Sequence, residues 1–370
     1  MVGAATSGER IGASGAVRFP VACDSSAERW RSKRQCLEGL QPCAPRRMRV
    51  LVTGAAGMLG RKLAERMARE GRLGSERISR LTLVDLVGAE PSGDAGVAVE
   101  RVVGDLSAPG VAAAIVAARP DVVFHLAAVV SGEAEDDLEK GYRVNVDATR
   151  MLLDAIGACG QGYRPRVVYS SSIAVFGPPL PDVIGDEHCA TPATSYGTQK
   201  AMIELLLSDH SRRGFVDGVA IRLPTICVRP GKPNLAASGF FSSIIREPLN
   251  GQDAVLPVST DVRHWFASPR AAIGFLLHAA TLDGSRLGDR RCLTMPGVSA
   301  TVADEIEALR RVGGEDAVRR VRHEPDEAIM RIVAGWPRAF EARHARALGF
   351  RAEADFDEIV RVHVEDELDH

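Results

Sequence analysis

Short apolar runs alternate with longer segments of helical period from residue 48 onward. The runs cover 49–53, 81–84, 99–103, 121–124 and 166–169, and each is short enough for a buried β-strand. Helical stretches such as Val111 to Ala118 and Asn145 to Ile156 separate them. Strands that alternate with helices in this way predict βαβ units and one parallel sheet with helices on both faces.

The pattern divides the chain into three parts. Residues 48–225 predict a doubly wound α/β domain of the Rossmann type that binds a dinucleotide. Beyond about 225 the alternation weakens, so we expect a smaller, mostly helical substrate domain over 226–370, which can return segments to the first domain. Residues 1–47 have no hydrophobic period and a net charge of +4. We expect a disordered extension there; a transit segment is the other interpretation, which its four acidic residues disfavour.

Composition narrows the choice of partners. The 370 residues are 45% hydrophobic and 25% charged, with a formal net charge of −2, which gives no electrostatic case for binding nucleic acid. The longest apolar stretch, Val122 to Val130, contains His125 and is too short to span a bilayer. Seven scattered cysteines form no CxxC pair. We therefore expect a cytoplasmic protein with no structural metal and no affinity for nucleic acid or membranes.

A glycine-rich turn gives the first chemical signal. Gly54, Gly57 and Gly60 lie between the first strand and the first helix. Close approach of the backbone to a pyrophosphate tolerates no Cβ, and a helix N-terminus offers unpaired N–H groups to the phosphates. A tight turn without a ligand would use the same residues, but the flanking strand and helix favour a dinucleotide site.

Two aspartates end the second and third strands. Asp85 can accept hydrogen bonds from the adenosine ribose hydroxyls and would repel the 2′-phosphate of NADP. The residues after it, Leu86 to Ala89, supply no Arg or Lys for that phosphate, so we expect NAD. Asp105 is a candidate for the adenine end of the cofactor. A solvated aspartate at a strand end is the plainer interpretation of Asp85.

A tyrosine and a lysine supply the second signal. Tyr196 and Lys200 are four residues apart, so they share one helix face. A nearby ammonium would lower the phenol's pKa, and the tyrosine could then act as a general base toward a substrate hydroxyl. A serine from the run 170–172, at the end of the preceding strand, can orient the same oxygen. After a glycine-rich βα turn, this combination indicates a redox site.

Five motifs together resemble the extended short-chain dehydrogenase/reductases, of the nucleotide-sugar epimerase/dehydratase type. They are Thr53–Gly60, His125–Ala128, Asn145–Val146, Tyr169–Gly177 and the pair Tyr196 and Lys200, and the resemblance covers about 48–350. It implies that Ser172, Tyr196 and Lys200 are catalytic, and that Asn145 orders the site and a proton-relay water. The cofactor contacts that it implies are Gly54, Gly57, Met58, Leu59, Gly60, Asp85, Asp105, Leu106, Ala127, Tyr196 and Lys200.

The substrate half resembles one subgroup of these enzymes, the D-erythronate dehydrogenases. The similar stretches are Val129–Glu135, Arg222–Ile226, Arg229–Asn234, Val262–Arg270 and Gly335–Pro337. This resemblance implies hydride transfer from C2 of a small sugar acid to NAD, giving the 2-oxo acid. Arg263 stands where the epimerases carry an arginine for the diphosphate, and we expect it to bind the substrate carboxylate. Ser131 and Asn234 are expected to support it, beside Ser172 and Tyr196.

Two other functions stay open at this point. A nucleotide-sugar epimerase or dehydratase would retain NAD through turnover. A catalytically silent dinucleotide sensor would need no catalytic residues, and the intact Ser172, Tyr196 and Lys200 argue against it. The family resemblance also implies a homodimer.

Overall fold

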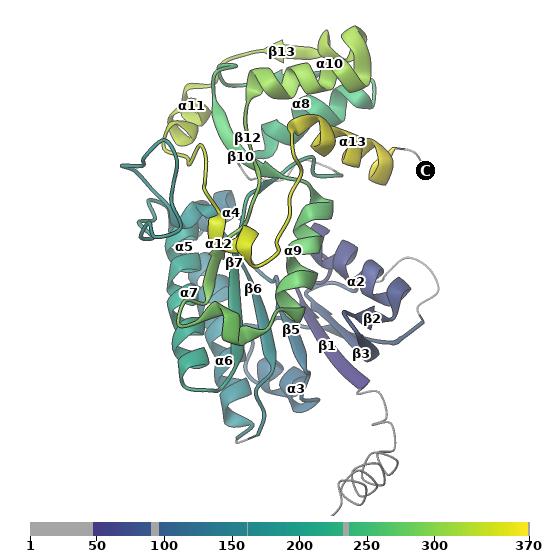
Figure 1. Cartoon of the computed structure of the whole chain (residues 1–370), viewed down its shortest axis with the longest axis vertical. Coiled ribbons are helices and arrows are strands. Elements are labelled where there is room, and N and C mark those ends of the chain that lie inside the picture. The colour runs from purple at the N-terminus through teal and green to yellow at the C-terminus, as the bar shows by residue number, and fades with distance from the viewer. Residues whose placement is uncertain (1–46, 90–95, 161, 232–236, 369–370) are drawn as a thin grey trace, which may run out of the picture. The chain divides into compact units, whose positions relative to one another are not determined.

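A parallel sheet lies at the centre of the structure, as the alternating pattern predicts (Figure 1). The computed structural model describes residues 47–89, 96–160, 162–231 and 237–368. The extension expected before residue 48 therefore lies outside the described residues, except for Arg47, which begins the first strand.

The main sheet has eight strands, and its order reverses at the first one. Its parallel strands lie in the order β4, β3, β1, β5, β6, β7, β11, and the short β2 pairs antiparallel with β3. Their bounds are β1 (Arg47–Thr53), β2 (Arg72–Leu73), β3 (Glu76–Asp85), β4 (Ala98–Val103), β5 (Val122–His125), β6 (Arg166–Ser172), β7 (Asp217–Leu223) and β11 (Cys292–Thr294). Because the chain crosses from β4 to β5 on the other side of β1, a crevice forms beyond the carboxyl ends of these strands, where such sheets bind ligands.

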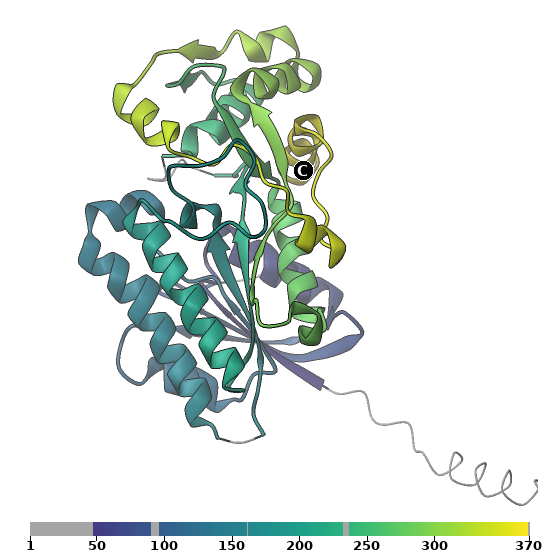
Figure 2. The same ribbon diagram turned by 60° about the vertical axis from the view of Figure 1, so that its left-hand side comes forward.

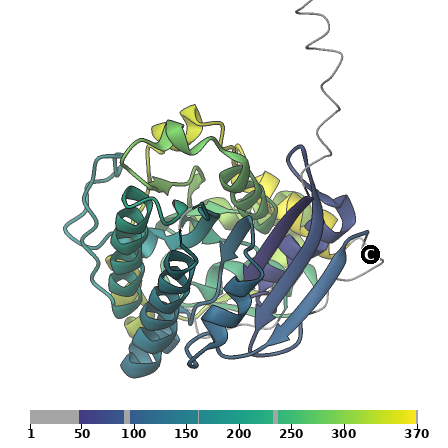
Figure 3. The same ribbon diagram turned by 90° about the horizontal axis from the view of Figure 1, so that it is seen from below.

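Helices cover both faces of this sheet (Figures 2 and 3). One face carries α3 (Val111–Ala117), α6 (Ala148–Ala158) and α7 (Ser195–Arg212), and the other carries α2 (Met58–Glu70) and α9 (Pro269–Thr281). The doubly wound α/β fold is thus confirmed. One expected element differs: the helix predicted from Asn145 begins with a π-helical segment, η1 (Tyr142–Asp147), before α6 follows as a regular α-helix.

The chain beyond β7 builds a second core of its own. Two small sheets and several helices surround it: β8 (Thr225–Ile226), β10 (Arg263–Ala267) and β12 (Val298–Thr301); β9 (Ala254–Leu256) and β13 (Val321–His323); α8 (Gly239–Leu249), α10 (Val302–Val318), α11 (Glu327–Ala334) and α13 (Phe356–Glu367). The strand β11 and the helix α9 come from the same part of the chain but join the main sheet. Short helical segments complete the fold: α4 (Ser131–Asp136), α5 (Leu138–Gly141), η2 (Ile173–Val175), η3 (Gly284–Leu287) and α12 (Arg343–Ala347).

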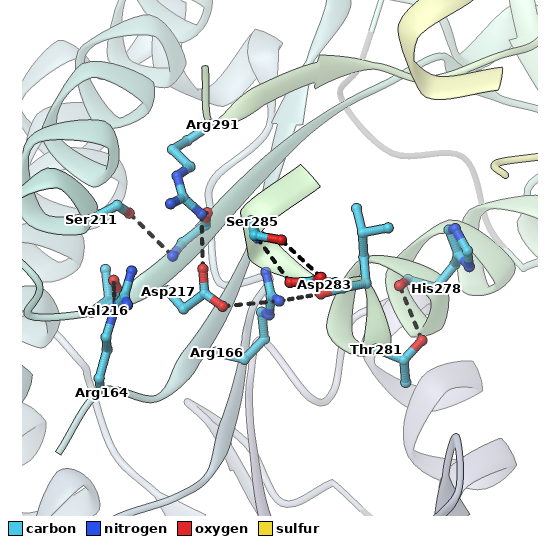
Figure 4. A network of polar contacts seen from close by, with 12 residues as sticks. Arg164, Arg166, Ser211, Val216, Asp217, His278, Thr281, Asp283, Ser285 and Arg291 are labelled. Atoms are coloured by element: carbon cyan, nitrogen blue, oxygen red, sulfur yellow. Dashed lines mark hydrogen bonds and ion pairs between the residues drawn. The ribbon is translucent and has the colours of Figure 1, made fainter. Parts of the chain in front are cut away.

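A half-buried carboxylate joins the amino ends of β6 and β7 (Figure 4). Asp217, the first residue of β7, forms an ion pair with Arg166 of β6 at 3.0 Å and another with Arg291 at 2.8 Å. Arg166 also donates to the carbonyl of Leu282. These contacts fasten β6, β7 and the segment entering β11 at the end of the sheet opposite the crevice.

The second core contains one unpaired acid. Glu305 of α10 is fully buried, and neither of its carboxyl oxygens has a hydrogen-bond partner among the described residues. Burial raises the pKa of Glu305 well above its usual range, and Asp304 adds to this rise. The side chain therefore stays protonated in the fold at pH values where the unfolded chain releases its proton.

None of the helices in the described ranges is long and apolar enough to cross a membrane.

Replacement of Glu305 by Met should stabilise the protein more strongly as the pH rises. The native state holds the Glu305 proton more tightly than the unfolded state, whose pKa is about 4.3. The stability that this group contributes is therefore complete below about pH 4 and is lost progressively as the pH climbs toward the raised folded pKa. Thermal unfolding from pH 4.5 to 8.5 should show a growing advantage for Glu305→Met, reaching about 1–3 kcal/mol. A pH-independent difference would contradict this explanation.

Candidate active site

The glycine-rich turn between β1 and α2 lies at the crevice. Gly54 has a φ of +73°, and a Cβ there would lie 2.5 Å from the backbone nitrogen of Ala127. A Cβ on Gly60 would overlap the carbonyl oxygen of Gly54. Gly57 caps α2 without a side chain, and the first turn of this helix carries no acidic residue. The open N-terminus and the close-packed backbone fit the pyrophosphate of a dinucleotide.

Most of the other predicted cofactor residues lie at the start of α2 or at or after the carboxyl ends of the neighbouring strands β3, β4 and β5. Asp85 ends β3, and its carboxylate accepts from the N–H groups of Ala56 at 2.9 Å and Leu86 at 2.7 Å. Asp85 therefore also holds the glycine-rich turn in place. Asp105 accepts from the backbone and the hydroxyl of Ser107, which lower the pKa of its carboxyl. Met58, Leu59 and Ala127 of the predicted set are half-buried. Leu106 is buried.

The fold brings Ser172, Tyr196 and Lys200 together. Ser172 ends β6, while Tyr196 and Lys200 lie near the start of α7, which packs across that strand. The Ser172 hydroxyl accepts from the N–H of Ala174 at 3.1 Å and favours the ionised form of the Tyr196 phenol. The Lys200 ammonium lies 5.5 Å from the centre of the Tyr196 ring and donates to the carbonyl of Ser170 at 2.8 Å. These residues form the geometry of a general-base site.

The electrostatics of this site differ from the expectation in two respects: the pKa of Tyr196 is raised, whereas the sequence predicted that it would be lowered, and the cation that opposes this rise is not Lys200. Burial raises the pKa of Tyr196 to about 12, and the hydrogen bond from Ser172 and the charge of Arg229 oppose this rise. Burial also lowers the pKa of Lys200 to about 7, against the effect of Glu204. The positive charge that lowers the pKa of Tyr196 is thus that of Arg229, whereas the sequence predicted that Lys200 would have this effect. Arg229 is held by the carbonyl of Ile226 and the hydroxyl of Ser238.

Asn145 is fixed by contacts on both sides. It lies in the π-helical segment η1, and its side chain accepts from the N–H of Val129 at 2.9 Å and donates to Gln199 at 2.7 Å. Its carbonyl accepts from Thr149, whose hydroxyl also contacts the buried ring of His125. Gln199 and Thr149 escaped the sequence analysis. Only the position of Gln199 beside Lys200 could have indicated it.

The predicted substrate residues lie farther apart. Ser131 begins α4 just beyond the carboxyl end of β5 and is half-buried. Arg263 begins β10, is exposed, and donates to the carbonyl of Ser299 at 3.2 Å. Asn234 lies outside the described residues. No hydrogen bond or ion pair found among the described residues joins Arg263 to Tyr196, so its role stays a prediction.

Comparison with known proteins identifies the family. A model described as the NAD dependent epimerase/dehydratase family matches residues 50–281. The chain belongs to this family. NAD is therefore its cofactor, as the sequence analysis expected, and the extended short-chain dehydrogenase/reductase assignment is confirmed.

Three relatives of this family member are similar over nearly their whole length. A D-erythronate dehydrogenase from Cupriavidus necator is 50% identical over 86% of this chain and 98% of its own. One from Haemophilus influenzae is 41% identical over 86% of this chain and 99% of its own. A crystal structure described as a nucleoside-diphosphate-sugar epimerase from Agrobacterium tumefaciens is 59% identical, with a TM-score of 0.86, over 89% of this chain and 97% of that one.

Asp85→Asn combined with Val87→Arg should move cofactor preference toward NADP. The asparagine keeps an oxygen for the N–H of Ala56 but removes the negative charge, and Val87 is exposed enough to be replaced by arginine. The ratio of the dissociation constants for NAD and NADP, measured by calorimetry, should shift by about tenfold or more. Val87→Arg alone is the control, since it keeps the repelling carboxylate. An unchanged ratio in the double variant would place the ribose elsewhere.

Proposed function

We propose that this protein oxidises C2 of a small sugar acid of the D-erythronate type to the 2-oxo acid, with NAD as hydride acceptor. The observation that carries this proposal is the Ser172–Tyr196–Lys200 geometry in a chain that is 50% identical to a D-erythronate dehydrogenase along almost all of that enzyme. Residues 48–225 would hold the cofactor, and residues 226–370 would supply most substrate contacts.

The roles of the residues follow from their contacts. Bound NAD supplies the nicotinamide carbon that receives the hydride. The positive nicotinamide of bound NAD would lower the pKa of Tyr196 from about 12, so that the ionised phenol could take the proton of the substrate hydroxyl. Ser172 orients that hydroxyl beside the phenol. Lys200, fixed by the Ser170 carbonyl, supports the nicotinamide ribose. Asn145, held by Val129 and Gln199, orders the path along which the proton leaves.

A nucleotide-sugar epimerase is the second candidate, because the similar structure from Agrobacterium tumefaciens carries that description. The two functions differ in the fate of the cofactor. A dehydrogenase releases NADH and needs added NAD, whereas an epimerase retains its cofactor. A silent sensor would bind NAD and turn over nothing.

One assay separates these three functions. The protein is mixed with NAD and a panel of four- to six-carbon sugar acids, and absorbance is followed at 340 nm. We expect continuous NADH formation with D-erythronate or a close analogue, and a 2-oxo acid as the product by mass spectrometry. Conversion of a nucleotide sugar without added NAD would favour the epimerase. Binding of NAD without turnover of either substrate class would favour the sensor.

We also expect a homodimer in the cytoplasm, as the sequence analysis did. Two large apolar side chains on α7 support the dimer: Met202 is 42% exposed and Leu205 is 74% exposed. A second copy of this helix surface would bury them.

Tyr196→Phe should abolish turnover and spare NAD binding. The substitution removes one hydroxyl and leaves the ring beside Lys200. Loss of a general acid–base group typically costs about 10²–10⁴-fold in kcat. Stopped-flow measurement of NADH formation, with calorimetry of NAD binding as the control, tests this. A kcat near that of the wild type would remove Tyr196 from the mechanism.

Arg263→Ala should lower kcat/KM for the sugar acid much more than for its neutral amide. A guanidinium binds a carboxylate through two hydrogen bonds, a geometry that lysine cannot copy, so Arg263→Lys should also lose much of kcat/KM. If substrate binding removes Arg263 from solvent, the alanine variant should lose about 2–5 kcal/mol of transition-state binding for the acid. If it keeps the full preference for the acid over the amide, another residue binds the carboxylate.

A further inference from the structure

A buried glutamate lies directly behind the catalytic residues. Glu204 follows Lys200 by four residues and Tyr196 by eight, so all three lie on one side of α7. Its side chain is 4% exposed. A carboxylate so deeply buried is costly unless it is paired, so its partners show what it holds.

Its partners are the two strands under α7. Glu204 accepts from the Ser171 hydroxyl of β6 at 2.6 Å. It also accepts two hydrogen bonds from Arg222 of β7, at 2.9 Å from Nε and 2.7 Å from Nη2. This fork geometry fixes orientation as well as distance. The Arg222 guanidinium in turn lies 4.9 Å over the ring of Phe176, which follows the catalytic end of β6.

The strand register makes these contacts relevant to the reaction. Ser171 lies beside Arg222 in the parallel pairing of β6 with β7, so both side chains reach the same carboxylate. The residues on either side of Ser171 are the ones that the site uses. The carbonyl of Ser170 accepts from Lys200, and the hydroxyl of Ser172 contacts Tyr196.

We propose that Glu204 is a positioning residue for this reaction: with Arg222 and Ser171 it fixes the end of β6 against α7, so that Ser172 meets Tyr196 and Ser170 meets Lys200. The proposal rests on the function proposed above and adds a residue to it. Glu204 touches neither substrate nor cofactor, and it acts through the residues that do.

The same contacts determine how charge is distributed around the site. Four groups lie near Lys200: Glu204 of α7, Tyr169 of β6, Tyr196 of α7 and His125 of β5. The charge of Arg229 acts on Tyr196. The thiol of Cys292 on β11 lies near Glu204. Removal of the Glu204 charge would leave Arg222 unbalanced. Both the Lys200 ammonium and the protonated Tyr196 would then lose protons more readily, because a positive charge disfavours both protonated forms.

Glu204→Gln is the principal test. It keeps the size of the side chain and an oxygen for Ser171, but loses the charge that binds Arg222. We expect kcat to fall about 10- to 100-fold, as for a displacement of catalytic groups by about 1 Å. The KM for NAD should change little, and the pH profile of kcat should move to lower pH. Should the variant fold poorly, Ser171→Ala tests the same link to β6 and leaves the Glu204–Arg222 pair intact.

Asp217→Asn is the matched control. Asp217 is also a carboxylate bound by two arginine side chains (Figure 4). It begins β7, whereas Arg222 lies near the other end of that strand. It should lower the melting temperature without lowering kcat or moving its pH profile. An equal fall of kcat in both variants would show that Glu204 serves only stability, and would overturn the proposal.

A measurement without substrate separates this proposal from the proposed function. The chain has five lysines, so the ε-carbon of Lys200 can be followed by NMR in ¹³C-lysine-labelled protein and assigned with Lys200→Arg. We expect the pKa of Lys200, about 7 in the parent, to fall in Glu204→Gln and to stay in Asp217→Asn. An unchanged Lys200 titration together with an unchanged kcat overturns the role of Glu204. If no sugar acid is oxidised by the wild type, the proposed function fails, and the titration still tests the positioning.

Discussion

The burial of one ammonium group governs the arrangement of this active site. Lys200 is 2% exposed, and a charge taken out of water is costly unless other groups replace the solvent. The Ser170 carbonyl, the faces of two tyrosine rings and the nearby Glu204 carboxylate offset part of this cost, and burial still lowers the pKa of Lys200 to about 7. These groups come from β6 and α7, so their contacts with Lys200 favour the observed register of the helix on the strand. That register also brings Tyr196 to Ser172.

The glycine-rich turn depends on a different constraint, namely that two of its positions have no room for a Cβ atom. Gly54 and Gly60 leave no room for a Cβ because the segment after β5 and the turn itself pack against their backbone. Asp85 then ties the turn to the end of β3. One carboxylate thus shapes the glycine-rich turn, and it is also the residue predicted to bind the adenosine ribose. The change of cofactor preference and the integrity of the turn are therefore linked through the same side chain.

Paired carboxylates and arginines hold the sheet at both ends, with different consequences. Asp217 with Arg166 and Arg291 closes the amino end, far from the crevice. Glu204 with Arg222 closes the carboxyl end, directly behind the catalytic residues. Similar chemistry would therefore stabilise the fold at one end and, in the role proposed for Glu204, align the reacting groups at the other. Glu305, which has no such partner among the described residues, shows the alternative, a carboxyl kept protonated by burial.

The sequence by itself determined the elements whose signals are local. The alternation of apolar runs and helical stretches, the Gly54–Gly57–Gly60 spacing and the helical spacing of Tyr196 and Lys200 each depend on neighbours in the chain, and they sufficed for the fold class, the cofactor and the catalytic candidates.

Tertiary structure alone decided which charged side chains lie next to one another. The pairing of Glu204 with Arg222 and Ser171, the approach of Arg229 to Tyr196 and the placement of Arg263 at an exposed strand start depend on strand register and helix packing. The π-helical turn at Asn145 belongs with them, because its contacts with Val129 and Gln199 come from other elements. Burial, which sets the pKa of every group in the site, exists only once the chain has folded.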